Sequence, residues 1–139
     1  MEASILIFKF LFIFFLYFLI FYINQNQIII LGEAKVIDGD TIHINNNKIR
    51  LHGIDAPELN QNCIYKEKNW ECGKNSKKNL LDLINSNQVK CKVNGMDRYK
   101  RYIATCFIGH LNINKIMVKE GWAIAYRYYS KDYVDEEFI

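Results

Sequence analysis

The chain opens with an apolar segment that has no polar face. Apolar residues run without interruption from 10 to 23, and residues 5–8 extend the run across the single charge of Lys9. Together they make 19 residues, close to the roughly 20 that span a bilayer. A buried core helix normally keeps a polar face. The pattern therefore predicts that residues 1–31 are a signal peptide or a transmembrane anchor.

The fate of this segment stays open. No Ala, Gly or Ser occurs from residue 5 to residue 31, and the first small-residue candidate, GEA at 32–34, would trim the start of the folded domain. This favours an uncleaved anchor, with a secreted or periplasmic protein as the alternative. Lys9 on the N-terminal flank favours a domain outside the cytoplasm.

Residues 32–139 begin with short alternating runs separated by turn signals. The dipeptide DG at 38–39 divides EAKVID from TIHI, which is typical of a hairpin. NNN at 45–47 marks the next turn, and KIRLHGI makes a third strand. In that strand Ile49 and Leu51 share one face, while Arg50 takes the other. Three strands joined by short turns predict a meander.

The remaining pattern predicts two helices and further strands around an irregular loop at residues 59–72. The expected elements are a helix in KNSKKNLLDLIN, strands in VKCKV and RYIATCFI, a helix from about Asn112 to Gly121, and a short strand in WAIAY. Five short strands with an interposed helix predict a mainly β, α+β fold. The specific expectation is a five-stranded OB-type barrel with two to three helices.

Charge and cysteine content refine this picture. Residues 32–139 carry 17 Lys+Arg and 14 Asp+Glu, and four of those acids lie in the tail DYVDEEFI, so residues 32–131 alone are +7. A basic body favours a polyanionic partner. All four cysteines lie in this domain. Behind an export-like segment they indicate two disulfides, with four reduced core thiols as the alternative; no CxxC spacing supports zinc.

Charged side chains gather at one end of the predicted meander. The first turn and the end of the third strand lie at the same end, so Asp40 and Asp55 are expected to converge there. Two carboxylates, a backbone carbonyl and water make a hard oxygen site suited to Ca²⁺. Pro57 restricts the chain before Glu58, and a carboxylate held beside a cation is able to deprotonate water.

Two arginines complete the arrangement. Arg50 points off the polar face of the third strand, and Arg101 follows the turn DRYK. A guanidinium matches phosphate oxygens bidentately and neutralises the charge that grows in a phosphoryl transition state. The residues therefore predict hydrolysis of a phosphodiester, with Arg50 and Arg101 on phosphate and Glu58 as general base. The three histidines are scattered and are expected to be structural or surface residues.

The motifs KVIDGDT, IRLHGIDAPE, DRYKR and LNINKIMVKEGWAIAYRYYS, in this order, resemble the staphylococcal nuclease (thermonuclease) family over residues 33–133. The resemblance implies a five-stranded OB-type barrel. It also implies calcium-dependent endonucleolysis of DNA and RNA that leaves 3′-phosphate ends, with single-stranded or unpaired regions favoured.

Residue roles follow from the same resemblance. Asp40 and Asp55 would bind calcium, and Ala56 would add a backbone carbonyl. Tyr99 and Tyr126 would line the nucleotide pocket, where stacking tolerates any base. The resemblance also implies the disulfide pairs Cys63–Cys72 and Cys91–Cys106.

Lys100 departs from the family pattern, because glycine is common there. If φ is positive at this position, lysine costs about 1 kcal/mol, although its charge would also attract phosphate. The chain also stops at Ile139, where many members continue their last helix. The main alternative function is a catalytically inactive, membrane-tethered barrel that binds nucleic acid. A membrane-tethered adaptor is a further alternative. Neither alternative requires the full set of five charged residues, which are Arg50, Arg101, Asp40, Asp55 and Glu58.

Overall fold

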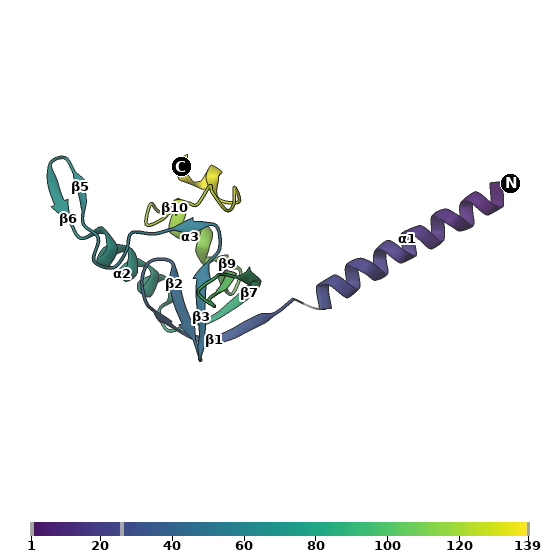
Figure 1. Ribbon diagram of the computed structural model, residues 1–139, viewed down its shortest axis with the longest axis horizontal. Coiled ribbons are helices and arrows are strands. Elements are labelled where there is room, and N and C mark those ends of the chain that lie inside the picture. Colours follow the sequence, from purple (N-terminus) through teal and green to yellow (C-terminus); the bar gives the residue numbers. More distant parts are fainter. Residues whose placement is uncertain (1, 26, 139) are drawn as a thin grey trace.

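The computed structural model describes residues 2–25 and 27–138 and combines a long N-terminal helix with a small barrel (Figure 1). Its helices are α1 (Glu2–Gln25), α2 (Cys72–Ile84), α3 (Ile113–Lys119) and the 3₁₀ helix η1 (Val134–Phe138). Its strands are β1 (Ile29–Val36), β2 (Thr41–Ile44), β3 (Asn47–Leu51), β4 (Ile54–Asp55), β5 (Cys63–Tyr65), β6 (Lys68–Trp70), β7 (Gln88–Met96), β8 (Tyr102–Ile108), β9 (Leu111–Asn112) and β10 (Ile124–Ala125).

Five strands close into the barrel. The sheet order is β3-β2-β1-β7-β8-β9, and parallel pairing of β3 with β8 closes the first five strands into a ring, with β9 paired to β8 outside it. β1, β2 and β3 form the expected meander through antiparallel pairs. β7 and β8 are antiparallel, with a bulge between Val93 and Gly95. The mainly β, OB-type barrel with helices that the sequence predicts is confirmed.

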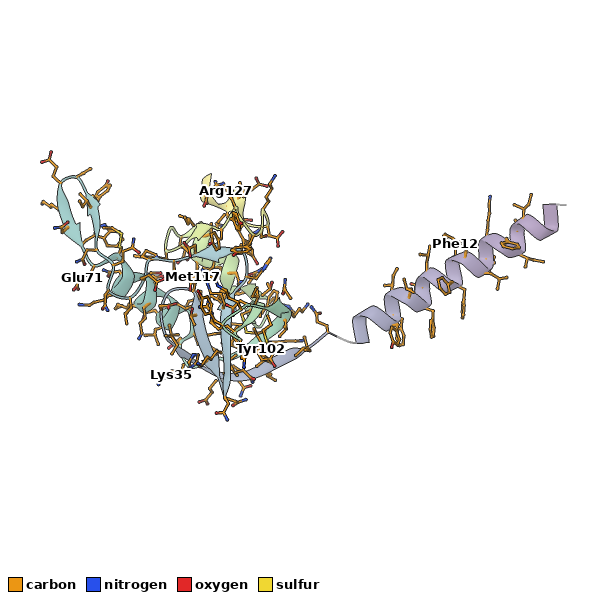
Figure 2. All side chains as sticks on the ribbon, in the orientation of Figure 1. Phe12, Lys35, Glu71, Tyr102, Met117 and Arg127 are labelled. Atoms are coloured by element: carbon orange, nitrogen blue, oxygen red, sulfur yellow. A yellow bond between two sulfur atoms is a disulfide. The ribbon has the colours of Figure 1, made fainter. Side chains whose placement is uncertain are left out.

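The core follows the alternation of the strands. Ile42, Ile44, Ile49 and Leu51 are buried, as are Leu80 of α2 and Met117 of α3; Figure 2 places Met117 inside the folded body. Burial of these apolar side chains supplies most of the driving force for folding. It also leaves Arg50 on the opposite face of β3, toward the end of the barrel that carries the charged residues.

A buried amide fastens α3 to the seam of the barrel. Asn114 is fully buried, and its Oδ1 accepts the Cys106 N–H at 3.0 Å. Its Nδ2 donates to the carbonyl oxygens of His52, at 2.9 Å, and Ala104, at 3.1 Å. Since these residues lie on or beside β3 and β8, one side chain braces the closing pair of strands.

Residues 59–72 are not the irregular loop that the sequence predicts. They contain the hairpin β5–β6, which projects from the body beside the start of α2 (Figure 1). Its two-residue turn is Lys66–Glu67, with φ of 48° and 63°. Hairpin turns of this kind normally carry Gly or Asn, so the usual sequence signal is missing. Without that signal the pattern predicts a loop.

Both disulfides implied by the family resemblance are present. Cys63–Cys72 ties the base of this hairpin to the first residue of α2, and Cys91–Cys106 joins directly opposed residues of β7 and β8. Cys91 and Cys106 are fully buried in the core. One disulfide therefore fixes a projecting element, and the other reinforces the barrel.

Helix α1 stands apart from the barrel. Every side chain described from Ile5 to Tyr22 is exposed, and Phe12 projects freely in Figure 2. The helix is long and apolar enough to cross a membrane, a property that a signal sequence shares. An apolar surface of this extent needs a non-aqueous partner.

Candidate active site

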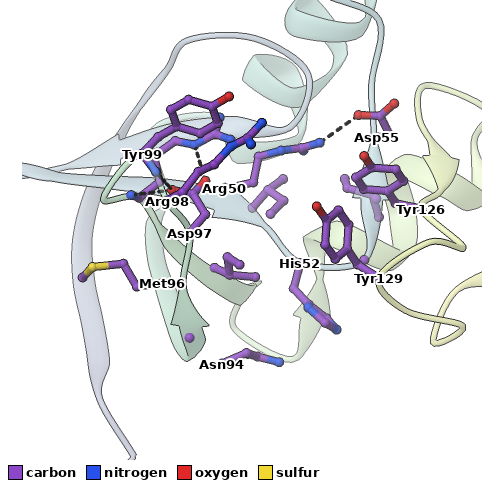
Figure 3. Close-up of a pocket in the computed structure, with 16 residues that line it drawn as sticks. Arg50, His52, Asp55, Asn94, Met96, Asp97, Arg98, Tyr99, Tyr126 and Tyr129 are labelled. Atoms are coloured by element: carbon purple, nitrogen blue, oxygen red, sulfur yellow. Dashed lines mark hydrogen bonds and ion pairs between the residues drawn. The ribbon is translucent and has the colours of Figure 1, made fainter.

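A pocket of about 640 Å³ opens at the end of β3. Its wall includes five residues that the sequence singles out: Arg50, Asp55, Tyr99, Arg101 and Tyr126. Figure 3 shows Arg50 reaching toward Asp55, with Tyr126 and Tyr129 on one side and Tyr99 on the other. The structure therefore brings together charged and aromatic residues from β3, β4, the β7–β8 turn and the segment after β10.

Arg50 bridges two carboxylates at the centre of the site. Its Nη2 donates to Asp55 Oδ1 at 2.8 Å, and its Nη1 lies 2.5 Å from Asp40 Oδ2. The second contact is an ion pair without hydrogen-bond alignment, which leaves the buried Nη1 without a hydrogen-bond acceptor. The convergence of Asp40 and Asp55 expected from the meander is thus present, with Arg50 between them.

The turn before β2 holds Asp40 in place. Asp40 Oδ2 accepts the Ala56 N–H at 2.8 Å, and Oδ1 accepts the Thr41 hydroxyl at 3.0 Å. α2 packs directly on this turn: a Cβ at Gly39 would lie 2.0 Å from Ser76 Oγ. Gly39 is therefore required by close packing, which the DG hairpin signal does not reveal.

Burial dominates the electrostatics of Asp40. Desolvation raises its pKa from 3.8 to about 6, although the Arg50 guanidinium and the Ala56 N–H act to lower it. Low polarity around a carboxylate disfavours its charged form. A cation bound here would favour the ionised form of the Asp40 carboxylate, as the Arg50 guanidinium does.

The turn between β7 and β8 is organised around Asp97. Its Oδ1 accepts the N–H groups of Tyr99, at 2.9 Å, and Arg101, at 3.0 Å, and its Oδ2 accepts Arg101 Nε at 2.8 Å. Burial acts to raise the pKa of Asp97, but these hydrogen bonds and the Arg101 charge hold it below its ordinary value. The two Nη groups of Arg101 donate to no described residue and are available to a ligand.

Aromatic rings flank these guanidinium groups. The Tyr99 ring centroid lies 4.9 Å from the Arg98 guanidinium and 5.6 Å from that of Arg101. On the other wall, Tyr126 and Tyr129 meet edge to face with centroids 4.9 Å apart. Tyr99 is largely exposed. Flat π-faces beside cations suit nucleobases and phosphates together.

Glu58 and Lys100 lie outside the pocket wall. Glu58 is exposed, three positions beyond Asp55, and its backbone exchanges hydrogen bonds with Gln61. Lys100 is exposed in the Asp97 turn with φ of +61°. The positive φ considered for Lys100 from the sequence is therefore present, and its side chain makes no recorded contact with the described residues.

Three further residues of the pocket are not among the site residues that the sequence predicts. Asp97 anchors Arg101, and an Asp at the start of a turn is a signal that could have identified it. His52 lines the pocket, and its Nε2 lies 2.9 Å from Asp132 Oδ2, eighty positions away. That contact, like the third aromatic ring at Tyr129, depends on the fold and has no local signal. His52 makes a structural contact with Asp132, as expected for a structural or surface histidine, and it also lines the pocket.

The donor set can be tested against a hard cation. No cluster of three or more His, Cys, Asp or Glu side chains occurs among residues 2–25 and 27–138. What the structure does place together is the carboxylates of Asp40 and Asp55, both bound to Arg50, with the Ala56 N–H on Asp40. Oxygen ligands with water completing the shell match Ca²⁺.

Comparison with known proteins places this site in a family. Residues 48–138 match the family model described as staphylococcal nuclease homologue. The chain belongs to the staphylococcal nuclease family. This span contains Arg50, Asp55, Glu58, Arg101 and Tyr126, and family membership agrees with the resemblance seen in the motifs.

Individual relatives cover similar stretches. An uncharacterized endonuclease of Haemophilus influenzae is 40% identical over 104 residues, covering 71% of this chain and 53% of that protein. Micrococcal nuclease of Shigella flexneri is 36% identical over 114 residues, covering 72% and 60%. Succinoglycan biosynthesis protein ExoI of Rhizobium meliloti is 36% identical over 98 residues, covering 68% and 51%. The chain thus spans between about half and three fifths of these relatives.

Proposed function

We propose that this protein is an endonuclease that hydrolyses phosphodiester bonds of DNA and RNA. The observation that carries the proposal is the pocket in which Arg50, Asp55 and Arg101 lie together between tyrosines, with Asp40 paired to Arg50. A binding module has no need for two carboxylates held against a phosphate-binding arginine. Membership in the nuclease family supports the same activity.

The residues divide the chemistry among themselves. Arg101, with free Nη groups, binds the scissile phosphate, and Arg50 joins it from β3. Glu58 accepts a proton from the attacking water while the water oxygen bonds to phosphorus. The P–O5′ bond then breaks, and the 5′ oxygen takes a proton from solvent, which leaves a 3′-phosphate as the family resemblance implies. General base catalysis of this kind contributes roughly 10²–10⁴ in rate.

Calcium is the proposed cofactor. Asp40 and Asp55 would hold it through their carboxylates, and Ala56 through its carbonyl oxygen. When bound, the ion would supply positive charge beside the phosphodiester. The two carboxylates would then no longer need Arg50, so its guanidinium is free to turn to the substrate.

Lys100, Tyr99 and Tyr126 are proposed to bind substrate. Tyr99 and Tyr126 face the pocket from opposite walls, which suits bases of unpaired strands, since stacked and paired bases do not offer their faces. Lys100 extends from the Asp97 turn into solvent and adds charge for the neighbouring backbone phosphate. Single-stranded or unpaired regions are therefore the proposed targets.

We further propose that residues 1–31 anchor the domain of residues 32–139 outside the cytoplasm. α1 has the length and apolar surface of a membrane span, and two disulfides suit an oxidising compartment. β1 pairs with β7 from Ile29 to Glu33, so cleavage after Ala34 would remove paired strand residues. N-terminal sequencing of the exported protein tests this, and a start near residue 35 would contradict it.

The activity is tested with the full chain in detergent. Cleavage of single-stranded DNA and RNA is followed with calcium or EDTA for the wild type, Glu58→Gln and Arg101→Ala. Glu120→Gln is the matched control, because Glu120 is an exposed glutamate beyond α3. We expect calcium-dependent cleavage and losses of about 10²–10⁴-fold for Glu58→Gln and about 10²–10³-fold for Arg101→Ala.

Product ends and binding complete the test. Labelled products should carry 3′-phosphates that a phosphatase removes. If folded wild-type protein binds the oligonucleotide but never cuts it, the alternative of an inactive binding barrel replaces the proposal. If cleavage persists in EDTA, the proposed role of calcium is wrong, while the proposed nuclease activity is retained.

A further inference from the structure

The hairpin β5–β6 projects from the body between the loop that carries Glu58 and the start of α2 (Figure 1). A two-residue turn closes it, and the Cys63–Cys72 disulfide fixes its base to α2. A second cavity, of about 550 Å³, is lined only by hairpin residues: Cys63, Ile64, Tyr65, Lys66, Lys68 and Trp70. Nothing in the proposed chemistry uses this element, although it exposes large aromatic side chains.

One face of the hairpin combines aromatic rings with a lysine. The register pairs Cys63 with Trp70 and Tyr65 with Lys68, and directly opposed residues share a face. Tyr65 and Trp70 are 65% and 39% exposed. They are diagonal neighbours on the two strands, about 7–8 Å apart. This is roughly twice the 3.4 Å rise per nucleotide of duplex DNA, so it suits bases of an extended strand.

The charge around the hairpin indicates which partner fits it. Residues 64–78 contain five lysines and two glutamates. Lys74 pairs with Glu71 and Lys78 with Asp82, and the other three lysines make no ion pair with the described residues. Lys66 lies over the Tyr65 ring at 5.2 Å, and Lys68 makes no ion pair with any described residue. Lysines between exposed rings match a polyanion with stacking bases. The tip, Lys66–Glu67, is charged on both residues, which opposes insertion of the hairpin into a lipid layer.

The base of the hairpin is attached to the loop that carries Glu58. The Gly73 N–H donates to the Gln61 carbonyl at 3.1 Å, and Gln61 N–H donates to the Glu58 carbonyl at 2.8 Å. The base of the hairpin therefore lies next to the loop that carries the proposed general base. The loop and the hairpin are held in a fixed relation by these bonds and by the Cys63–Cys72 disulfide.

We propose that the Tyr65–Lys68–Trp70 face of the hairpin is a second binding site for single-stranded nucleic acid, which grips the substrate several nucleotides from the cut. The inference rests on the proposed nuclease function. Its role is to raise affinity for long strands, because a dinucleotide bound in the pocket cannot reach both sites.

A direct binding measurement isolates the hairpin. The chain has two tryptophans, so Trp122→Phe leaves Trp70 as the sole reporter in the full chain in detergent. Oligothymidylate of about 20 nucleotides, longer than the roughly 4–16 that one OB-type barrel covers, is titrated in EDTA. We expect quenching of Trp70, and weaker binding by roughly 5- to 150-fold for each ring removed in Tyr65→Ala and Trp70→Ala. Binding of the variants is measured by oligonucleotide anisotropy.

The matched control lies on the same strand. Asn69→Ala changes the opposite face between Lys68 and Trp70 and should bind the long strand as the wild type does. In cleavage assays, Tyr65→Ala/Trp70→Ala should raise KM for the long strand and leave kcat/KM for a dinucleotide unchanged. Thermal unfolding checks that the double variant retains the fold.

The outcomes separate the two proposals. Unaltered KM together with no Trp70 quenching overturns the hairpin site while the nuclease stands. Quenching without any cleavage by the wild type retains the hairpin site and removes the nuclease. A blue shift of Trp70 emission when the chain is moved from detergent into phosphatidylcholine vesicles, together with no quenching by the oligonucleotide, would overturn the nucleic-acid site in favour of a lipid contact.

Discussion

Gly73 packs its Cα against the carbonyl oxygen of Glu58, so that an added Cβ would lie 1.8 Å from that oxygen. No side chain fits at this distance. The first turn of α2 therefore sets the position of the loop that carries the proposed general base. The Gly73 N–H also donates to the Gln61 carbonyl at 3.1 Å, which fixes the loop from its other end.

Replacing Gly73 by alanine should displace Glu58. A shift of about 1 Å at a catalytic group costs about 10²-fold in rate, so Gly73→Ala should reduce kcat by that order. Overpacking should also lower the free energy of unfolding by roughly 1–3 kcal/mol. Gly95→Ala is the stability control, because a Cβ there meets nothing within 4 Å. If Gly73→Ala retains the kcat of the wild type, then packing against α2 does not set the position of Glu58.

Asp40 gives the protein an unusual dependence of stability on pH. Burial raises its pKa to about 6 from 3.8, so the native state holds this proton more tightly than the unfolded chain. This contribution is complete below about pH 4 and is lost as the pH rises through 6, by up to about 3 kcal/mol. Denaturant unfolding in EDTA at several pH values measures it.

The difference between wild type and Asp40→Asn isolates that group, since other carboxylates titrate in both. From pH 4 to pH 6.5 the wild type should lose stability relative to the variant. Calcium should then restore stability to the wild type at pH 7 by mass action and do little for Asp40→Asn. Parallel pH profiles for the two proteins would contradict the raised pKa.

Lys100 occupies a backbone conformation that favours glycine. Its φ is +61°, which costs an L-residue roughly 1–2 kcal/mol, partly offset by the greater chain entropy of glycine. Lys100→Gly should therefore raise the free energy of unfolding by about 0.5–1 kcal/mol. Lys100→Ala is the matched control, because it removes the charge but keeps the Cβ. If both variants bind nucleic acid more weakly but only Lys100→Gly is more stable, the charge of Lys100 acts on binding and its backbone conformation acts on stability.

The barrel was predictable from the sequence because its signals are local. Alternation in residues 41–51 and short turns specify the meander, and a meander places Asp40 and Asp55 at one end without further knowledge. The same alternation places Arg50 on the polar face of the third strand, but its pairing with both carboxylates appears only in the structure. What alternation does not give is the closing pair β3–β8, which joins Ile49 to Tyr102 across the chain.

Features that rest on tertiary packing were out of reach. The hairpin β5–β6 lacks the Gly or Asn that normally marks its turn, so residues 59–72 looked irregular. The roles of Gly73 and Gly39 depend on what lies against them, which is Glu58 in one case and Ser76 in the other. His52 and Asp132 meet only because the C-terminal segment folds back over the pocket.

Asp97 should act as a positioning residue for Arg101. Its carboxylate accepts the Arg101 Nε at 2.8 Å and two backbone N–H groups of the turn. Asn in its place retains an oxygen for the backbone but can turn an N–H donor toward Nε, so the turn persists while the guanidinium loses its partner. We expect kcat to fall by about 10-fold, the order of one charge-assisted hydrogen bond. The fold should persist at pH 7 with a lower free energy of unfolding, because the variant lacks the contribution of the ionised carboxylate.

A double-mutant cycle decides whether Asp97 acts through Arg101. If it does, Asp97→Asn should reduce kcat in the wild type and have almost no further effect in Arg101→Ala, because the group that it positions is already gone. Additive losses in the double variant would mean that Asp97 contributes on its own, through the turn or the field in the pocket.

Acid supplies an independent check. Hydrogen bonds from Arg101 and Tyr99 keep the pKa of Asp97 below its ordinary value, so the stability that Asp97 provides is present above that ordinary value. It is lost only as the pH falls through the folded pKa. The Asp97→Asn variant should lack this acid-dependent loss, measured by denaturant unfolding from pH 5 downward.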